Sequence, residues 1–239
     1  PLYLRCLSRT YSAVLTESES TRRDLSRYGF PLRRIHLFRI GTHLAPVNKL
    51  TTKKDINNVL ILGSIRPMKR TLHGIKAFET ARDQNPELHL TIAGDASGMY
   101  AEKVKRYITR SRHASAITIL GRVSAKQRLN LMREAAVIVV TSVKEGWGLI
   151  VTEANTQGTP GLAYDVDGLR DSIRAKETGL LAPSGNSAVL GTQIFTLLND
   201  PGHYATLREA AWQSSKQYTF ANSYQDFAQI ITSSTGLSL

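Results

Sequence analysis

Cysteine is almost absent from this chain, and so are long apolar runs. Cys6 is the single cysteine among 239 residues, which excludes an intrachain disulfide framework and metal sites built from several cysteines. No apolar run approaches the ~20 residues of a membrane-spanning helix, and no segment has the pattern of a signal peptide. These absences are typical of a cytoplasmic protein. Because the chain opens with Pro1 rather than Met, we expect its natural start to lie upstream.

Aromatic residues are also sparse, at 7% of the chain, whereas hydrophobic residues make up 41%. This composition is ordinary for an α/β protein with a buried core, and the length suits one domain or two small ones. The six histidines show no metal-ligand spacing: His36, His43, His73, His89, His113 and His203. We therefore expect no histidine metal site.

Acidic residues are outnumbered by basic ones, 19 to 31, which gives a net charge of +12. Nine basic and three acidic residues lie in the first 50, so half of the excess is there. Two interpretations of this segment stay open: contact with a phosphorylated substrate or with anionic lipid at the inner membrane face, or an ordinary solvated surface. We expect no nucleic-acid partner, because the basic residues are not interleaved with aromatic ones and no nucleic-acid module is recognisable.

Short apolar runs alternate with helical patterns through the middle of the chain. Each run is apolar on both faces, which is typical of parallel strands covered by helices. The predicted strands are Asn58 to Leu62, Leu88 to Ala93, Ala116 to Leu120, Ala136 to Thr141, Gly161 to Tyr164 and Leu180 to Ala182. Helices are predicted over Thr71 to Gln84 and Ser124 to Ala135. This alternation predicts an α/β fold with a Rossmann-like, doubly wound parallel sheet.

The ends of the chain have a different pattern. Two strands, at residues 13–16 and 35–40, are predicted around a capped helix at residues 20–28, and residues 42–55 have linker composition. Residues 1–55 are therefore interpreted as a remnant of another domain with a linker, and residues 56–200 as the ligand-binding domain. Residues 201–239 are expected to form C-terminal helices that pack back toward the N-terminal part.

One motif combines two carboxylates with a glycine turn. Glu145-Gly146-Trp147-Gly148-Leu149-Ile150-Val151-Thr152-Glu153 follows the apolar run that ends at Thr141. A buried strand that opens through glycines into a helix leaves backbone N–H groups and the positive helix end free to bind a phosphate. The flanking glutamates can accept hydrogen bonds from sugar hydroxyls. The motif therefore favours a nucleotide-sugar pocket. Gly63, Gly94 and Gly121 also follow predicted strand ends, where such sheets bind ligands.

Five motifs follow one another along the chain. They are Val59-Leu60-Ile61-Leu62-Gly63-Ser64-Ile65-Arg66-Pro67-Met68-Lys69-Arg70, then Leu90-Thr91-Ile92-Ala93-Gly94-Asp95, then Leu120-Gly121-Arg122-Val123-Ser124, then Glu145 to Glu153 with Ala154-Asn155 and Gly158-Thr159-Pro160, then Gly168-Leu169-Arg170 with Thr178-Gly179-Leu180-Leu181. In this order they resemble the donor domain of family-4 retaining glycosyltransferases of GT-B architecture. The resemblance covers roughly residues 10 to 235. Ser18 to Gly29 resembles the last helix of that family's N-terminal acceptor domain, so residues 1–55 would be a stub of that domain.

The resemblance implies roles for the basic residues and the turn. Lys69 matches the family's lysine at the diphosphate, and Arg66 is a second candidate, although the family's arginine commonly stands where Ser64 does. The N–H groups of Trp147, Gly148 and Leu149, with Gly146 in the same turn, would complete the anion site without a metal. Gly63 and Ser64 would line the donor pocket. Arg122 and Val123 would bracket the base, largely through backbone.

The glutamates would hold the sugars. Glu153 matches the residue that binds ribose hydroxyls, and Glu145 matches the one near the transferred sugar. The implied reaction moves a sugar from a nucleoside-diphosphate sugar to a glycan, a lipid-linked or another small acceptor, with retained anomeric configuration and no cofactor. Lys69, Arg66 and Glu145 are the catalytic candidates.

Three alternatives remain. The chain could bind nucleotide or nucleotide sugar without transferring it, because most of the acceptor domain has no counterpart here. Asp165-Val166-Asp167 spells a D-X-D metal pattern, which is weak as a lone tripeptide. A basic nucleic-acid module would instead bind with a steep salt dependence and no preference for nucleoside diphosphates.

Overall fold

The structure is a computed structural model that describes residues 3, 7, 8, 10–51 and 56–236. Cys6 and part of the predicted linker, residues 52–55, lie outside the described residues. No helix in the described segments is both long enough and apolar enough to cross a membrane.

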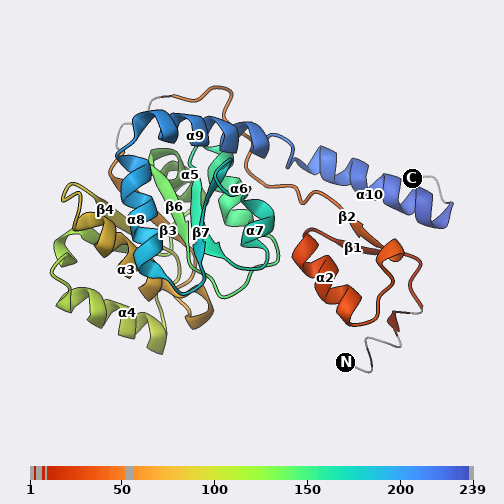
Figure 1. The fold of residues 1–239 in the computed structure, drawn as a ribbon, viewed down its shortest axis with the longest axis horizontal. Helices are drawn as coiled ribbons and strands as arrows, with labels where there is room; N and C mark the ends of the chain where they lie inside the picture. The colour runs from red at the N-terminus through yellow and green to blue at the C-terminus, as the bar shows by residue number, and fades with distance from the viewer. Residues whose placement is uncertain (1–2, 4–6, 9, 52–55, 237–239) are drawn as a thin grey trace.

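A six-stranded, fully parallel sheet forms the centre of the molecule (Figure 1). Its strands are β3 (Asn58–Leu62), β4 (His89–Ala93), β5 (Ile117–Gly121), β6 (Val137–Val140), β7 (Gly161–Asp165) and β8 (Gly179–Pro183). The spatial order is β5-β4-β3-β6-β7-β8, so the chain winds outward in one direction from β3 and in the other from β6. This order confirms the predicted doubly wound sheet.

Helices cover both faces of this sheet, because right-handed crossovers that run in opposite directions place their helices on opposite faces. One face carries α3 (Thr71–Arg82), α4 (Met99–Arg110) and α8 (Ser187–Leu198). The other carries α5 (Ala125–Glu134), α6 (Leu149–Thr156) and α9 (Pro201–Ser215), and α7 (Leu169–Ser172) follows β7. The chain also forms three short 3₁₀ turns: η1 (Leu32–Arg34) in the N-terminal part, η2 (Pro67–Lys69) before α3 and η3 (Ala114–Ala116) before β5.

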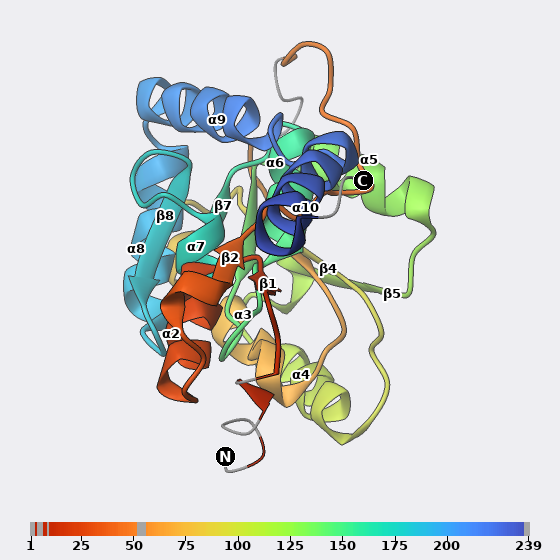
Figure 2. The ribbon, with the colours of Figure 1, turned by 90° about the vertical axis from the view of Figure 1, so that its right-hand side faces the viewer.

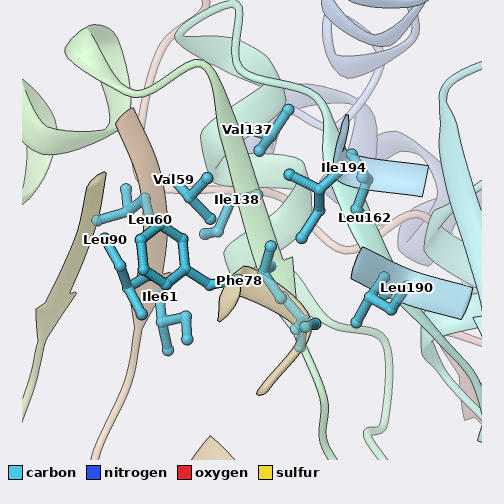
Figure 3. Packing of buried hydrophobic residues seen from close by; sticks show 14 of the residues in the cluster. Val59, Leu60, Ile61, Phe78, Leu90, Val137, Ile138, Leu162, Leu190 and Ile194 are labelled. Atoms are coloured by element: carbon cyan, nitrogen blue, oxygen red, sulfur yellow. The ribbon is translucent and has the colours of Figure 1, made fainter. Parts of the chain in front are cut away.

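The core lies on both faces of the sheet, and Figure 3 shows part of it. The cluster includes Phe78 of α3 on one face and Met132 of α5 and Val151 of α6 on the other. Phe78 of α3 is completely buried, and Leu60, Ile138 and Leu162 reach the same cluster from three neighbouring strands. Ile194 of α8 belongs to the same cluster. This burial explains why the strands read as apolar on both faces in the sequence.

The N-terminal part forms a separate two-stranded parallel sheet (Figures 1 and 2). Its strands are β1 (Val14–Thr16) and β2 (Ile35–Leu37), and α2 (Glu19–Arg27) runs between them. The N-cap of α2 is Ser18, whose hydroxyl accepts from the N–H of Thr21 at 3.1 Å. Two parallel strands with one crossover helix bury little apolar surface alone, so further contacts must hold this part in place.

The C-terminal helices provide part of those contacts. Helix α9 packs against α6 of the large sheet, whereas α10 (Phe220–Thr235) extends to the N-terminal part (Figure 1). The Arg39 guanidinium binds the Asp226 carboxylate of α10 through two hydrogen bonds, at 2.7 and 2.5 Å. The Thr42 N–H donates to the Tyr218 carbonyl at 2.9 Å. Two described segments therefore run between the two parts, at residues 38–51 and 216–219. The predicted domain boundaries stay a prediction.

Candidate functional site

A pocket lies at the carboxyl edge of the sheet between β3 and β6, where the winding direction reverses. Ligands of doubly wound folds bind at this topological switch point. Gly63, Ser64 and Lys69 line the pocket from the β3 side, and Thr141 and Ser142 line it from the β6 side.

Hydrogen bonds join the loops on either side of this pocket. The Thr141 hydroxyl lies 3.0 Å from the carbonyl oxygens of both Lys69 and Arg70. The Val143 N–H donates to the Met68 carbonyl at 2.8 Å. These contacts bring η2 against the loop that follows β6.

Lys69 and Glu145 meet at this junction. The Lys69 Nζ lies 2.5 Å from Glu145 Oε1, and the Ser142 hydroxyl donates to the same oxygen at 2.5 Å. Both side chains are partly buried, at 29% and 16% exposure. A cation and a carboxylate are thus held side by side at the mouth of the pocket, where a ligand with both phosphate and hydroxyl groups could engage each of them.

The glycine turn supplies N–H groups beside this pair. Gly148 is the N-cap of α6 and has φ +90°, a conformation that favours glycine. The N–H groups of Gly146, Trp147, Gly148 and Leu149 donate to no acceptor within the described residues. Unpartnered N–H groups at a helix N-terminus favour an anion. The Trp147 side chain is used in packing, because its Nε1 donates to Thr152 Oγ1 at 2.9 Å and its ring lies 5.3 Å from that of Tyr218.

Glu153 lies one turn further along α6. Its side chain is 8% exposed and forms an ion pair with the Arg128 guanidinium of α5. Burial raises the pKa of the Glu153 carboxyl, while the positive charge of Arg128 and the proximity of His43 act in the opposite direction. Neither glutamate lines the pocket between β3 and β6 itself. Glu145 borders it through Lys69 and Ser142, whereas Glu153 contacts Arg128 of α5, so the two glutamates have different neighbours.

The ends of β3, β4 and β5 are joined at this edge. The N–H of Gly63 donates to Ala93 at 2.9 Å, and that of Gly94 donates to Gly121 at 2.8 Å. A Cβ on Gly94 would lie 2.1 Å from the Gly63 carbonyl oxygen, so this close approach requires glycine. Arg66 is exposed at the start of η2, where its carbonyl accepts from the Lys69 N–H.

Arg122 and Val123 lie between β5 and α5. The Arg122 side chain is 81% exposed and pairs with Asp95 at 2.9 Å. A hydrogen bond from Ser97, with one from Arg122, lowers the pKa of Asp95 to about 2. Ser124 then caps α5, because its hydroxyl accepts from the Gln127 N–H and the Gln127 side chain accepts from the Ser124 N–H.

The D-X-D tripeptide is engaged in ion pairs. Arg170 lies 2.8 Å from Asp165 and 3.5 Å from Asp167, and Lys144 lies 3.6 Å from Asp167. Among residues 10–51 and 56–236, no three His, Cys, Asp or Glu side chains are grouped as metal ligands. His73 Nδ1 lies 3.0 Å from the Tyr164 hydroxyl, and burial lowers its pKa.

Sequence reasoning missed several residues of this edge. Ser142 follows a buried strand directly, which is a signal for a site residue that the motif alone did not include. Arg128 and His43 reach Glu153 from segments that only the fold brings close. No sequence spacing relates them to Glu153.

Comparisons with known proteins agree with this fold. Residues 47–214 match the family model of glycosyl transferases group 1. A D-inositol 3-phosphate glycosyltransferase of Pseudarthrobacter chlorophenolicus is 29% identical over 198 residues, which cover 78% of this chain and 47% of the relative. A poly(glycerol-phosphate) alpha-glucosyltransferase of Bacillus subtilis is 28% identical over 180 residues, which cover 75% of this chain and 26% of the relative.

A solved structure shows the same fold. Anabaena HepE, crystallised with UDP and glucose, superposes with a TM-score of 0.81 at 20% identity and covers 97% of this chain and 66% of HepE. This chain spans less than half the length of the curated relatives named above. Because the family model covers well over half of the chain, this chain belongs to the group 1 glycosyl transferases, and its large sheet is a Rossmann-like half of a GT-B fold.

Proposed function

We propose that this chain is the donor-binding half of a retaining glycosyltransferase that moves a sugar from a nucleoside-diphosphate sugar to an acceptor. The observation that carries this proposal is the Lys69–Glu145 pair beside the unpartnered N–H groups of the Gly146–Leu149 turn. Groups that can bind a phosphate and a group that can bind sugar hydroxyls therefore lie side by side at the mouth of this pocket.

The positive groups act on the leaving phosphate. Departure of a sugar from a diphosphate builds negative charge on the phosphate, and fixed donors that face this charge lower the barrier. Lys69 and the N–H groups of Trp147, Gly148 and Leu149 would bind the diphosphate, and Arg66 would approach it from the exposed end of η2. Lys69 is also available to exchange its Glu145 partner for a phosphate oxygen. This arrangement needs no metal ion.

The carboxylates divide the sugars between them. Glu145 would accept hydrogen bonds from hydroxyls of the transferred sugar, and Glu153 from ribose hydroxyls. Arg122 and Val123 would lie at the base, and Gly63 with Ser64 at the floor of the pocket. Retention of configuration follows from the family resemblance alone, with the leaving phosphate helping to take the acceptor proton.

The relatives support a sugar nucleotide and a small acceptor. HepE binds UDP and glucose, and the two curated relatives are named for phosphorylated acceptors, D-inositol 3-phosphate and poly(glycerol-phosphate). For this chain we propose a glycan, a lipid-linked or another small acceptor. A cytoplasmic location with peripheral contact to anionic membrane belongs to the same proposal.

Calorimetry tests this proposal through binding, because the chain spans less than half of its curated relatives. UDP, GDP, ADP and their sugars are titrated with and without chelator. We expect saturable binding of one nucleoside diphosphate that survives chelation. Strict metal dependence would instead favour the Asp165 and Asp167 site, and absence of nucleotide binding would refute the proposal.

A further inference from the structure

Helix α4 presents three exposed cations, Lys103, Arg106 and Arg110, that form no ion pair among the described residues. The hydrogen bond and charge of Lys105, with the charge of Arg106, lower the pKa of the Glu102 carboxyl. Other cations nearby are paired: Lys105 with Glu102 at 2.8 Å, and Arg112 with Asp83 at 2.6 Å. The three unpaired cations are spaced i, i+3 and i+7, so they share one face of the helix.

These cations line a cleft. Its other lining residues are Leu72 of α3, Tyr107 of α4 and Ser111, which follows α4. The Leu72 N–H lies 3.4 Å from the Tyr100 hydroxyl, so the start of α3 is held against the start of α4. The cleft thus has a partly apolar floor and a rim of positive charge, and Leu72 lies three residues after Lys69 in the chain.

The Glu79 carboxylate forms no ion pair with these three cations. Glu79 of α3 accepts hydrogen bonds from the Tyr107 hydroxyl, at 2.7 Å, and from the Ser111 hydroxyl. Lys76 also stands over the Tyr107 ring, 6.0 Å from its centroid. The Glu79 carboxylate is therefore engaged by two neutral donors, while Lys103, Arg106 and Arg110 are exposed to solvent.

We propose that this cleft binds a phosphate-bearing group, as a phosphomonoester or phosphodiester. Guanidinium groups bind phosphate oxygens through paired, charge-assisted hydrogen bonds, and an ammonium adds a flexible point charge. The Tyr107 ring and Leu72 would contact the carbon skeleton that carries the phosphate. The same chemistry occurs in soluble phosphate esters and in lipid headgroups, and the site is separate from the donor pocket between β3 and β6.

The experiment has two arms that use the same variants. In the first, glycerol 1-phosphate is titrated onto the ¹⁵N-labelled chain, and amide shifts report where it binds. In the second, vesicles of phosphatidylcholine with and without phosphatidylglycerol are sedimented with the chain. The variant is Arg106→Gln with Arg110→Gln, and the control is Lys126→Gln with Lys176→Gln, which removes the same charge from exposed sites elsewhere.

We expect shifts at Leu72, Tyr107 and Ser111 in the first arm, or selective binding to phosphatidylglycerol in the second. Removal of two cations should weaken this binding about 10- to 30-fold, and the control about twofold or less. Binding in the first arm alone identifies a soluble ester, and in the second alone a lipid headgroup. The proposal is overturned if neither arm shows binding, if the shifts cluster at Lys69 and the Gly146–Leu149 turn, or if both variants lose affinity equally.

Discussion

Lys69 and Glu145 are 76 residues apart in the chain, yet the Lys69 Nζ lies 2.5 Å from Glu145 Oε1. The contact exists because β3 and β6 are neighbours in the sheet and each ends at the same edge. Thr141 then fixes the distance between the two loops through the carbonyls of Lys69 and Arg70.

Replacement of Lys69 by Ala should weaken the binding of nucleoside diphosphates more than the binding of nucleoside monophosphates. The lost charge-assisted contact corresponds to about 1.5–3 kcal/mol of binding free energy. Calorimetry with the best-binding diphosphate and its monophosphate measures this difference, and Lys126→Ala, at an exposed site on α5, is the control. Equal losses for both nucleotides would remove Lys69 from the diphosphate site.

Glu145→Ala should reduce affinity for the nucleotide sugar more than for the bare nucleotide. Glu145 lies beside Lys69 at the pocket mouth, whereas Glu153 lies further along α6. Parallel titrations of the diphosphate and its sugar compare the two losses. If they are the same, Glu145 does not contact the transferred sugar.

Glu153→Ala should weaken the bare nucleotide by about 1–3 kcal/mol, because ribose hydroxyls lose their acceptor. The same replacement should change the affinity for a 2′,3′-dideoxy nucleotide little, since this ligand lacks those hydroxyls. Glu87→Ala, an exposed glutamate before β4, is the matched control. A similar loss for ribose and dideoxyribose nucleotides would contradict the ribose role.

Stability should depend on pH through Glu153. Burial raises the pKa of its carboxyl in the folded state, so the folded state favours the protonated form. The stabilisation is fully present below the unfolded-state pKa and is lost as pH rises through the folded-state pKa. The free energy of unfolding of the native chain should therefore fall relative to Glu153→Gln across that window. Urea titrations at several pH values measure the difference, and pH-independent curves would exclude it.

The pairing with Arg128 opposes this shift, which allows a second test. Arg128→Leu should raise the pKa of the Glu153 carboxyl further. As the pH falls, this variant should therefore protonate Glu153, and lose nucleotide affinity, at a higher pH than the native chain does. Arg133→Leu, on the same helix, is the comparison. A pH profile of binding that does not move with Arg128→Leu would show that Arg128 has no effect on the Glu153 carboxylate.

Gly148→Ala should lower the free energy of unfolding by more than backbone strain alone would, because steric contacts add to the strain. At φ +90°, an added Cβ would also lie 2.8 Å from Leu169 Cδ2 and 3.0 Å from Ser172 Oγ. Gly185→Ala provides the comparison, because φ is +86° there and no atom lies within 4 Å of the new Cβ. We expect about 1–2 kcal/mol for Gly185 and a larger loss for Gly148, measured by thermal unfolding. Equal losses would mean that the neighbours of Gly148 move without cost.

The strands of the large sheet were predictable because each is apolar on both faces. Predicted and observed bounds of β3 coincide at Asn58 and Leu62, and those of the other five strands agree within one residue. The strand predicted at residues 35–40 ends at Leu37, because beyond Phe38 the chain leaves the β1 pairing and its next polar contacts are with α10. Helix α10 begins at Phe220, because the Thr219 side chain caps it by accepting from the Asn222 N–H.

The amino-acid sequence alone determined the strand and helix periods, the glycine turn and the order of the motifs, since these depend on neighbours along the chain. It could not show that Arg128 pairs with Glu153, that Ser142 and Lys69 share one carboxylate oxygen, or that Arg39 binds Asp226. Those contacts join segments that are distant in sequence, and they form only once the strand order and the crossovers have placed the segments at the same edge. The tertiary structure therefore decided which charges meet, and at what distance.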